Sequence, residues 1–330
     1  MRVLPIALLV AFLVSALWRG WGALPGNYAF VTLNQLPSLF ASDLDPAALA
    51  RTETQLLTAL DYQPERASTW RMLALVRRAQ GAKAPTGLTA DELLRWGRQK
   101  EQGGDLGAAQ YLYQWATDVE PDLGDGWYRL GNLYQTQEAL TTARQAYERA
   151  ALASTWQKVG RSDLYAAQAD LLLATQPGDS AAAPRDLYHQ ALAVDQFGDM
   201  AARATTHYKL GELLLWREGD PATAVAHYRA TLAIAPTDHW ARLRLGYALY
   251  WSGAGVANVA AAEREILTAI AQWPDEKHLK WPYFYLGEMY ENAGLPLKAI
   301  AAYEQVIALD PADERVQARL ALLYSRQRSQ

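Results

Sequence analysis

The sequence predicts an all-α fold, built as a stack of helical hairpins. Three observations indicate it: a Leu-Gly pair recurs along the chain, an alanine and then a tyrosine follow most of these pairs at similar offsets, and prolines close most of the units. The two clearest units align without gaps at an offset of 34 residues. The pairs are Leu130-Gly131, Leu210-Gly211, Leu245-Gly246 and Leu286-Gly287, with Trp96-Gly97 in the same place in the first unit.

Each unit carries a narrow apolar stripe at helical spacing. Trp127, Leu130 and Tyr134 recur three and four positions apart, so they share one face of a helix. A single hairpin cannot bury such a stripe, so successive hairpins must stack. The glycine of each pair costs about 1 kcal/mol of helix propensity relative to alanine. We therefore expect a neighbouring helix to approach closely at these glycines.

The first residues form an apolar segment. Val3 to Trp18 carries no charge and lies between Arg2 and Arg19. It is slightly short for a spanning helix of about 20 residues and long for a signal-peptide core of about 7–15 residues. Residues 1–23 are therefore a signal anchor or a cleaved signal peptide. The charge balance favours a bacterial membrane with the repeats on the extracytoplasmic side, or export.

The rest of the chain divides by composition and register. Residues 24–45 contain Pro25, Gly26 and Pro37 and are predicted to be a linker. Residues 46–89 are predicted to form an irregular helical hairpin. Residues 90–328 hold about six hairpins and a C-terminal capping helix from Glu314. The expected units are 90–123, 124–157, a degenerate one near 165–198, then 204–237, 239–276 and 280–313.

These units resemble tetratricopeptide repeats, whose pattern is Trp, Leu-Gly, Tyr, Ala, Phe or Tyr, Ala and Pro. Residues 127–150 match almost every position, with Tyr147 in the Phe place, although Thr155 stands where the closing proline is expected. The chain is similar to membrane-anchored or exported bacterial proteins with such repeats. The resemblance implies a right-handed α-solenoid that acts as a protein–protein interaction scaffold or adaptor.

Composition excludes several kinds of function. The chain has no cysteine, which excludes disulfides, thiolate metal sites and a cysteine nucleophile. Its net charge of −4 and the lack of a basic face argue against nucleic acid as a partner. The five histidines form no metal motif, and although His207 and His227 can approach each other across a hairpin, we predict surface histidines. No cofactor or metal is expected.

Catalysis is not expected either. The acidic residues show no aligned basic partner or pocket, so no general acid–base pair is apparent. The repeats and the N-terminal segment use nearly all of the chain and leave no room for a catalytic domain. We therefore predict that the chain is not an enzyme.

The resemblance also implies a concave groove, lined by the first helix of each unit. Those positions are rich in aromatic residues, which suit an extended peptide or a glycan whose sugar rings stack on Trp. The alternative that these rings only fill gaps between helices stays open. The predicted groove residues are Tyr128, Asn132, Gln135, Tyr208, Glu212, Trp216, Trp240, Tyr247, Tyr250, Trp251, Trp281, Phe284, Glu288 and Asn292.

The groove is also predicted to lack the lysines and arginines with which some family members clamp a terminal carboxylate. We favour a peptide or partner protein as the ligand. Two alternatives remain: a cell-envelope glycan, and self-assembly of copies of this chain into a structural protein. The membrane is a further partner through residues 3–18 if the segment is not cleaved.

Overall fold

The computed structural model describes residues 46–62, 73, 76, 89–175, 181–253, 256–273 and 275–328. These residues form fourteen α-helices, one π-helical turn and one 3-10 turn, and within them the only β contact is an isolated bridge between Leu123 and Thr155. The prediction of an all-α fold is confirmed. The right-handed sense of the solenoid and the domain boundaries stay predictions.

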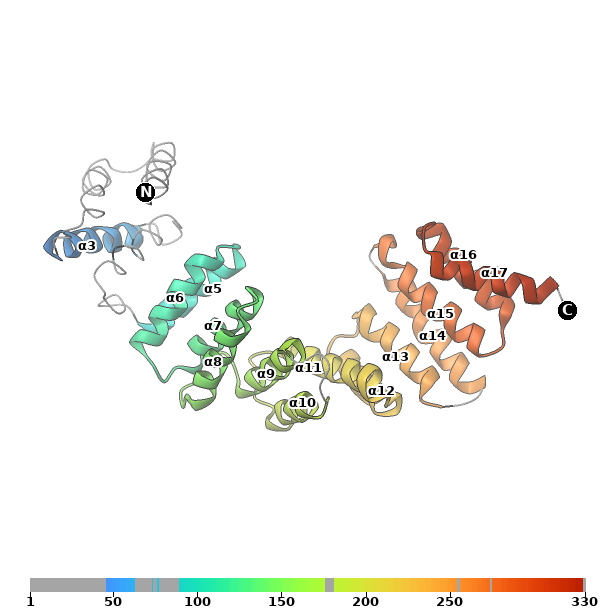
Figure 1. Ribbon diagram of the computed structural model, residues 1–330. Helices are drawn as coiled ribbons and strands as arrows, with labels where there is room; N and C mark the ends of the chain where they lie inside the picture. Colours follow the sequence, from blue (N-terminus) through green and yellow to red (C-terminus); the bar gives the residue numbers. More distant parts are fainter. Residues whose placement is uncertain are drawn as a thin grey trace. The chain divides into compact units, whose positions relative to one another are not determined.

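The chain divides into two compact units, Met1–Trp156 and Gln157–Gln330. In the first, α5 pairs with α6 and α7 with α8 as antiparallel hairpins, and α6 packs on α7 (Figure 1). The helices of this unit are α3 (Pro46–Tyr62), α5 (Ala90–Gln102), α6 (Leu106–Val119), α7 (Gly124–Thr136) and α8 (Leu140–Leu152).

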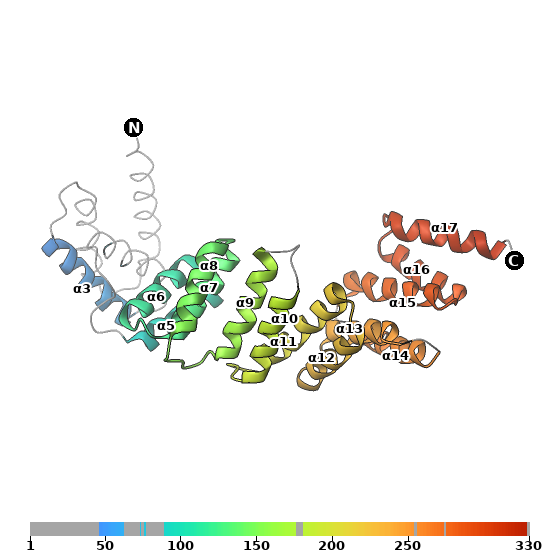
Figure 2. The same cartoon turned by 60° about the horizontal axis from the view of Figure 1, so that its bottom comes forward.

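The second unit continues the same architecture. Its hairpins are α9/α10, α11/α12, α13/α14 and α15/α16, and α17 packs against α16 (Figures 1 and 2). The helices are α9 (Arg161–Thr175), α10 (Ala182–Val194), α11 (Met200–Leu213), the π-helix η2 (Leu214–Glu218), α12 (Pro221–Ile234), α13 (His239–Trp251), α14 (Val256–Gln272), the 3-10 turn η3 (Glu276–His278), α15 (Lys280–Asn292), α16 (Pro296–Leu309) and α17 (Glu314–Arg328).

None of the helices in the described ranges is long and apolar enough to cross a membrane. The apolar segment 3–18 and the linker 24–45 lie outside the described residues.

Aspartates start several of the helices. The carboxylates of Asp105, Asp199, Asp220 and Asp238 each accept a hydrogen bond from the backbone N–H three residues on, at 2.7–3.2 Å. These bonds satisfy amides that have no partner within the helix, the usual role of an N-cap. These hydrogen bonds fix where each of the four helices begins.

The recurring glycines lie where the paired helix approaches closely, as expected, and all but Gly246, which meets Ile266, lie against a tyrosine ring. A Cβ added to Gly131 would stand 2.3 Å from Cε1 of Tyr147, and one added to Gly287 would stand 2.4 Å from Cε1 of Tyr303. Both tyrosines are almost fully buried. The missing side chain therefore makes room for the ring, and ring burial offsets the propensity cost of glycine.

The α9/α10 hairpin lacks this glycine and is braced by its loops instead. The carboxylate of Asp163 accepts hydrogen bonds from the N–H groups of Gly160 and Gly198, at 2.7 and 2.8 Å. The hydroxyl of Ser162 accepts another from the N–H of Gln196 at 2.8 Å. The extra residues that flank the degenerate unit in the sequence thus form a polar link between two loops.

Thr155 has a structural role in place of the expected proline. Its carbonyl accepts a hydrogen bond from the N–H of Gly124 at 2.8 Å, and its own N–H donates to the carbonyl of Asp122 at 3.2 Å. The segment that follows α8 is therefore extended and pairs with the turn before α7. A proline has no N–H and could not make the second bond.

Candidate functional site

The predicted groove residues of the first unit mainly brace their own hairpin. The hydroxyl of Tyr147 on α8 lies 2.6 Å from Oδ1 of Asn132 and 2.9 Å from Oε1 of Gln135, both on α7. The rings of Tyr128 and Tyr147 are 6.3 Å apart between centroids. Asn132 and Gln135 are therefore engaged within the hairpin.

Four aromatic rings of the second unit form a continuous set, which we call the aromatic strip: Trp216 of η2, Tyr247 and Trp251 of α13, and Tyr285 of α15. Trp216 stacks on Tyr247 at 5.2 Å, and Tyr247 meets Trp251 and Tyr285 edge-on at 6.1 and 4.8 Å. Trp216 and Trp251 are 47% and 46% exposed, whereas Tyr247 is 8% exposed. Two half-exposed indoles thus rest on a buried ring.

The expectation that Tyr247 faces an open groove is wrong. Its ring is covered by neighbouring aromatics, and its hydroxyl donates a hydrogen bond of 3.1 Å to Glu288 on α15. Burial, together with the negative charge of Glu288, raises the pKa of Tyr247 above its ordinary value. Tyr247 supports the exposed indoles and is not itself an open contact.

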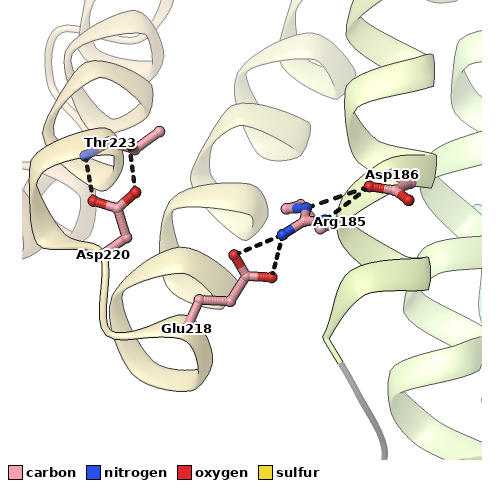
Figure 3. A network of polar contacts seen from close by, with 5 residues as sticks. All are labelled: Arg185, Asp186, Glu218, Asp220 and Thr223. Carbon is pink, nitrogen blue, oxygen red and sulfur yellow. Dashed lines mark hydrogen bonds and ion pairs between the residues drawn. The ribbon is translucent and has the colours of Figure 1, made fainter.

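A π-helical turn presents Trp216. The α11 helix ends in the five-residue η2, and such turns occur often at functional sites because they redirect side chains. Glu218, at the end of η2, accepts two hydrogen bonds from Nη1 of Arg185 on α10, at 3.0 and 3.1 Å (Figure 3). Asp220 then caps α12 through Thr223 (Figure 3). The turn that carries Trp216 is thus held by the polar contacts of Glu218 and Asp220, which follow Trp216 in the chain.

A cleft of about 270 Å³ adjoins Trp216. Pockets for whole small molecules start at about 300 Å³, so this cleft suits one or two side chains of a larger ligand. It is lined by Asp170, Leu173, Tyr188, Lys209, Glu212, Leu213, Trp216 and Arg217.

Arg244 lies behind the strip. Its guanidinium carbon is 5.2 Å from the ring centre of Trp216 and 5.1 Å from that of Tyr285, which are cation–π distances. Its Nε is 3.0 Å from Oε1 of Glu212, an ion pair without hydrogen-bond alignment. Burial alone would lower the pKa of Arg244, but Glu212 and Tyr285 hold it above its ordinary value. A permanent positive charge therefore lies over the rings of Trp216 and Tyr285.

Two predictions about charge are wrong. The groove was expected to lack lysine and arginine, and the acidic residues were expected to lack basic partners. Instead Lys209 Nζ lies 2.6 Å from Asp170, and Arg244 pairs with Glu212. Both cations come from first helices of hairpins and reach a carboxylate of the preceding hairpin.

A sequence signal for these cations exists. Arg129, Lys209 and Arg244 each stand directly before a Leu-Gly pair, so they share one register in three units. Arg129 likewise lies 3.6 Å from Glu101 of the preceding hairpin. Tyr285, which sequence reasoning also missed, holds the same register before Leu286.

Two predicted tryptophans lie apart from the strip. Trp240 packs edge-on against Trp273 at 4.7 Å, and His239 lies 4.3 Å from the same Trp273 ring. The ammonium of Lys280 stands 5.4 Å from the ring centre of Trp281. Neither indole joins the set around Tyr247.

Phe284 and Glu288 contact the capping helix. Arg315 and Arg319 of α17 each place the guanidinium carbon 5.7 Å from the Phe284 ring centre. Arg319 also pairs with Glu288 at 3.4 Å and with Glu291 at 3.1 Å. These predicted groove residues hold α17 on the last hairpin.

The remaining predicted residues differ in setting. Tyr208 packs edge-on against Tyr228 at 5.9 Å, and burial, with Glu212 nearby, raises the pKa of Tyr208 to about 12. Tyr250 is half-buried and meets Trp251 at 5.1 Å, so it borders the strip. Asn292 is exposed at the end of α15.

Three histidines come together on α10, α11 and α12. Nδ1 of His207 lies 3.1 Å from Nδ1 of His227, and the ring centres of His189 and His227 are 5.9 Å apart. The approach of His207 and His227 is as expected, but both rings are half-buried and so are not simple surface residues. In the described part of the chain, no group of three or more His, Asp or Glu side chains is placed to hold a metal ion.

Comparison with known proteins identifies the repeat in two segments of the chain. Family models of the tetratricopeptide repeat match residues 94–158 and 282–313. The chain contains tetratricopeptide repeats in these two segments. A comparison with curated proteins gives no match.

Solved structures share the fold of this chain. PilF of Pseudomonas aeruginosa is 15% identical with a TM-score of 0.55, covering 70% of this chain and 96% of that chain. PilW, described as a widely conserved type IV pilus biogenesis factor, is 14% identical with a TM-score of 0.53, covering 70% and 98%. A chain of the APC/C hetero-tetramer Cut9–Hcn1 is 15% identical with a TM-score of 0.50, covering 90% and 52%. Identities this low indicate a common fold only.

Proposed function

We propose that this scaffold binds an extended peptide segment of a partner protein across the aromatic strip. The observation that carries the proposal is the pair of half-exposed indoles, Trp216 and Trp251, joined through the buried ring of Tyr247. Tryptophan dominates the energetics of many interfaces because it buries a large area at a small entropic cost. The adjoining cleft then receives a side chain of the ligand.

The charges around the strip favour a ligand that brings no net charge to it. The cleft carboxylates of Asp170 and Glu212 are already paired with Lys209 and Arg244. Arg244 already occupies the cation position over the rings of the strip. An added cation there would meet a fixed like charge, which is unfavourable in partly buried surroundings. Apolar contacts, and not a charge clamp, are therefore expected to supply the affinity.

A glycan is the second candidate, because sugar rings also stack on exposed indoles. It is less favoured because sugar hydroxyls need polar partners, and the polar groups lining the cleft are largely engaged with one another. Self-assembly is the other alternative. Size-exclusion chromatography with light scattering separates it from peptide binding, since a monomer at working concentration contradicts self-assembly.

The proposed location is outside the cytosol of a bacterial cell. The apolar segment from Val3 to Trp18 supports it, and so does the fold shared with PilW, a type IV pilus biogenesis factor. Alkaline phosphatase fused to the C-terminus should be active, because the enzyme needs an oxidising compartment for its disulfides. An inactive fusion of normal abundance would contradict the proposal.

A displayed peptide library selected against the full chain tests the binding function. Selected peptides should bind the wild type and lose binding to the double variant Trp216→Ala/Trp251→Ala. The matched control is Leu267→Ala/Leu322→Ala, which removes two equally exposed side chains from α14 and α17. Circular dichroism checks that both variants keep their helix content. No enrichment, or equal binding by both variants, would contradict the proposal.

A further inference from the structure

The three histidines of α10, α11 and α12 lie outside the aromatic strip and take no part in the proposed function. His207 and His227 face each other across the α11/α12 hairpin, with their Nδ1 atoms 3.1 Å apart and their ring centres 5.4 Å apart. Each nitrogen comes from a different helix, so packing of the hairpin fixes their separation. Both residues are half-buried.

These distances match those of two imidazoles that share a metal ion. Zn²⁺ binds imidazole nitrogen at about 2.0–2.1 Å, so two ligands at a tetrahedral angle lie about 3.3 Å apart. The centres of two such rings are then about 5–6 Å apart. A shift of a few tenths of an ångström brings the observed pair to this geometry, without movement of the helices.

The surroundings are compatible with a bound cation. Asp195, the C-cap of α10, lies 3.4 Å from Nη1 of Arg203, and these two groups are the charges that act most on His207. The Arg203 cation is thus paired with a carboxylate. Exposed His189 stands one helix away, with its ring centre 5.9 Å from that of His227.

We propose that His207 and His227 bind a divalent transition-metal ion through their Nδ1 atoms, with water completing the coordination. Imidazole nitrogen is a preferred ligand of Zn²⁺, Ni²⁺ and Cu²⁺ and a poor one for Mg²⁺. The ion links α11 to α12 and stabilises the hairpin that carries η2 and Trp216. A hydrogen bond between two neutral imidazoles gives the same spacing without a metal, so experiment must separate the two.

The test uses the full chain after treatment with a chelator. Ni²⁺, Zn²⁺ and Mg²⁺ are titrated separately by isothermal calorimetry, and the thermal unfolding midpoint is measured with each ion. We expect Ni²⁺ and Zn²⁺ to bind and raise the midpoint, and Mg²⁺ to do neither. His207→Gln and His227→Gln should each weaken binding about tenfold or more, while His278→Gln, on exposed η3, should not.

Two results would overturn the proposal. One is wild-type protein that binds neither Ni²⁺ nor Zn²⁺, which leaves only the hydrogen bond. The other is binding that survives both ligand substitutions but is lost in His278→Gln or His239→Gln. Because a variant can lose binding by misfolding, its helix content and its midpoint without metal are measured alongside. Loss of binding with an unchanged metal-free midpoint supports the site.

Discussion

The hydroxyl of Tyr228 donates a hydrogen bond of 2.6 Å to Glu212 across the α11/α12 hairpin. The same carboxylate pairs with Arg244 of the next hairpin. This arrangement, in which a tyrosine of the second helix, an acid of the first helix and a cation of the following helix meet, recurs along the chain. Its other instances are Tyr113–Glu101–Arg129, Tyr188–Asp170–Lys209 and Tyr303–Glu291–Arg319.

These contacts connect one hairpin to the next, and their loss should destabilise the stack. The guanidinium of Arg244 is nearly buried, and Glu212→Leu removes the carboxylate that pairs with it. We expect a loss toward the lower end of about 3–5 kcal/mol, since both side chains keep some exposure. Urea denaturation measures it. Adding Arg244→Met should recover much of the loss, whereas an unchanged Glu212→Leu midpoint would refute the role of the pair.

The close approach at Gly131 gives a second prediction. Gly131→Ala places a methyl group 2.3 Å from the Tyr147 ring, so despite better helix propensity it should destabilise by about 1–3 kcal/mol, and Gly131→Leu by more. Gly107→Ala is the matched control, because Gly107 is exposed in the first turn of α6 and the added Cβ meets nothing closer than 4.0 Å. The control should be neutral or stabilising by up to about 1 kcal/mol. Equal effects of the two alanines would contradict this account of the packing.

The ion pair of Arg185 and Glu218 should hold the π-helical turn. Glu218→Gln weakens both charge-assisted hydrogen bonds, so backbone amides of residues 214–218 should exchange with deuterium faster. Glu265→Gln is the control, because Glu265 pairs with Arg242 at 3.1 Å in the α13/α14 hairpin. Exchange in η2 that is equally fast in both variants would show that the pair does not position Trp216.

The lowered pKa of Glu263 makes the free energy of unfolding depend on pH. Its carboxylate accepts hydrogen bonds from Lys298 and Tyr290, at 2.8 and 2.7 Å, and these contacts lower its pKa below the ordinary value near 4.3. The native state therefore binds this proton less readily than the unfolded state does. The stabilisation is complete above the ordinary pKa and is lost as pH falls through the lowered one. The difference in melting temperature between wild type and Glu263→Gln should shrink below about pH 4; a constant difference would contradict it.

The fold could be predicted from the sequence because its signals are local. Glycine and its partner lie at helical offsets, and each recurring glycine meets a side chain of its own hairpin, as Gly131 meets Tyr147. The α9/α10 hairpin was harder, because its bracing through Asp163 joins two loops that no periodicity identifies.

The site could be predicted only in part. Trp216 and Trp251 could be predicted because they occupy positions of the repeat that do not supply its core. Burial of Tyr247 was missed because it depends on Tyr285 from another hairpin and on the π-helical turn, and neither leaves a pattern in the sequence. The cations before the Leu-Gly pairs did leave such a pattern, and a comparison of registers would have found Lys209 and Arg244.

Indole N–H signals in a ¹⁵N spectrum of the full chain test the central claim most directly. Trp216→Phe and Trp251→Phe assign two of the twelve tryptophans, and a library-selected peptide is then titrated. We predict that the Trp216 and Trp251 signals shift in a saturable way, while that of Trp127, whose indole donates to the carbonyl of Pro121, stays in place. A saturable shift confined to tryptophans outside the strip would contradict binding at this surface.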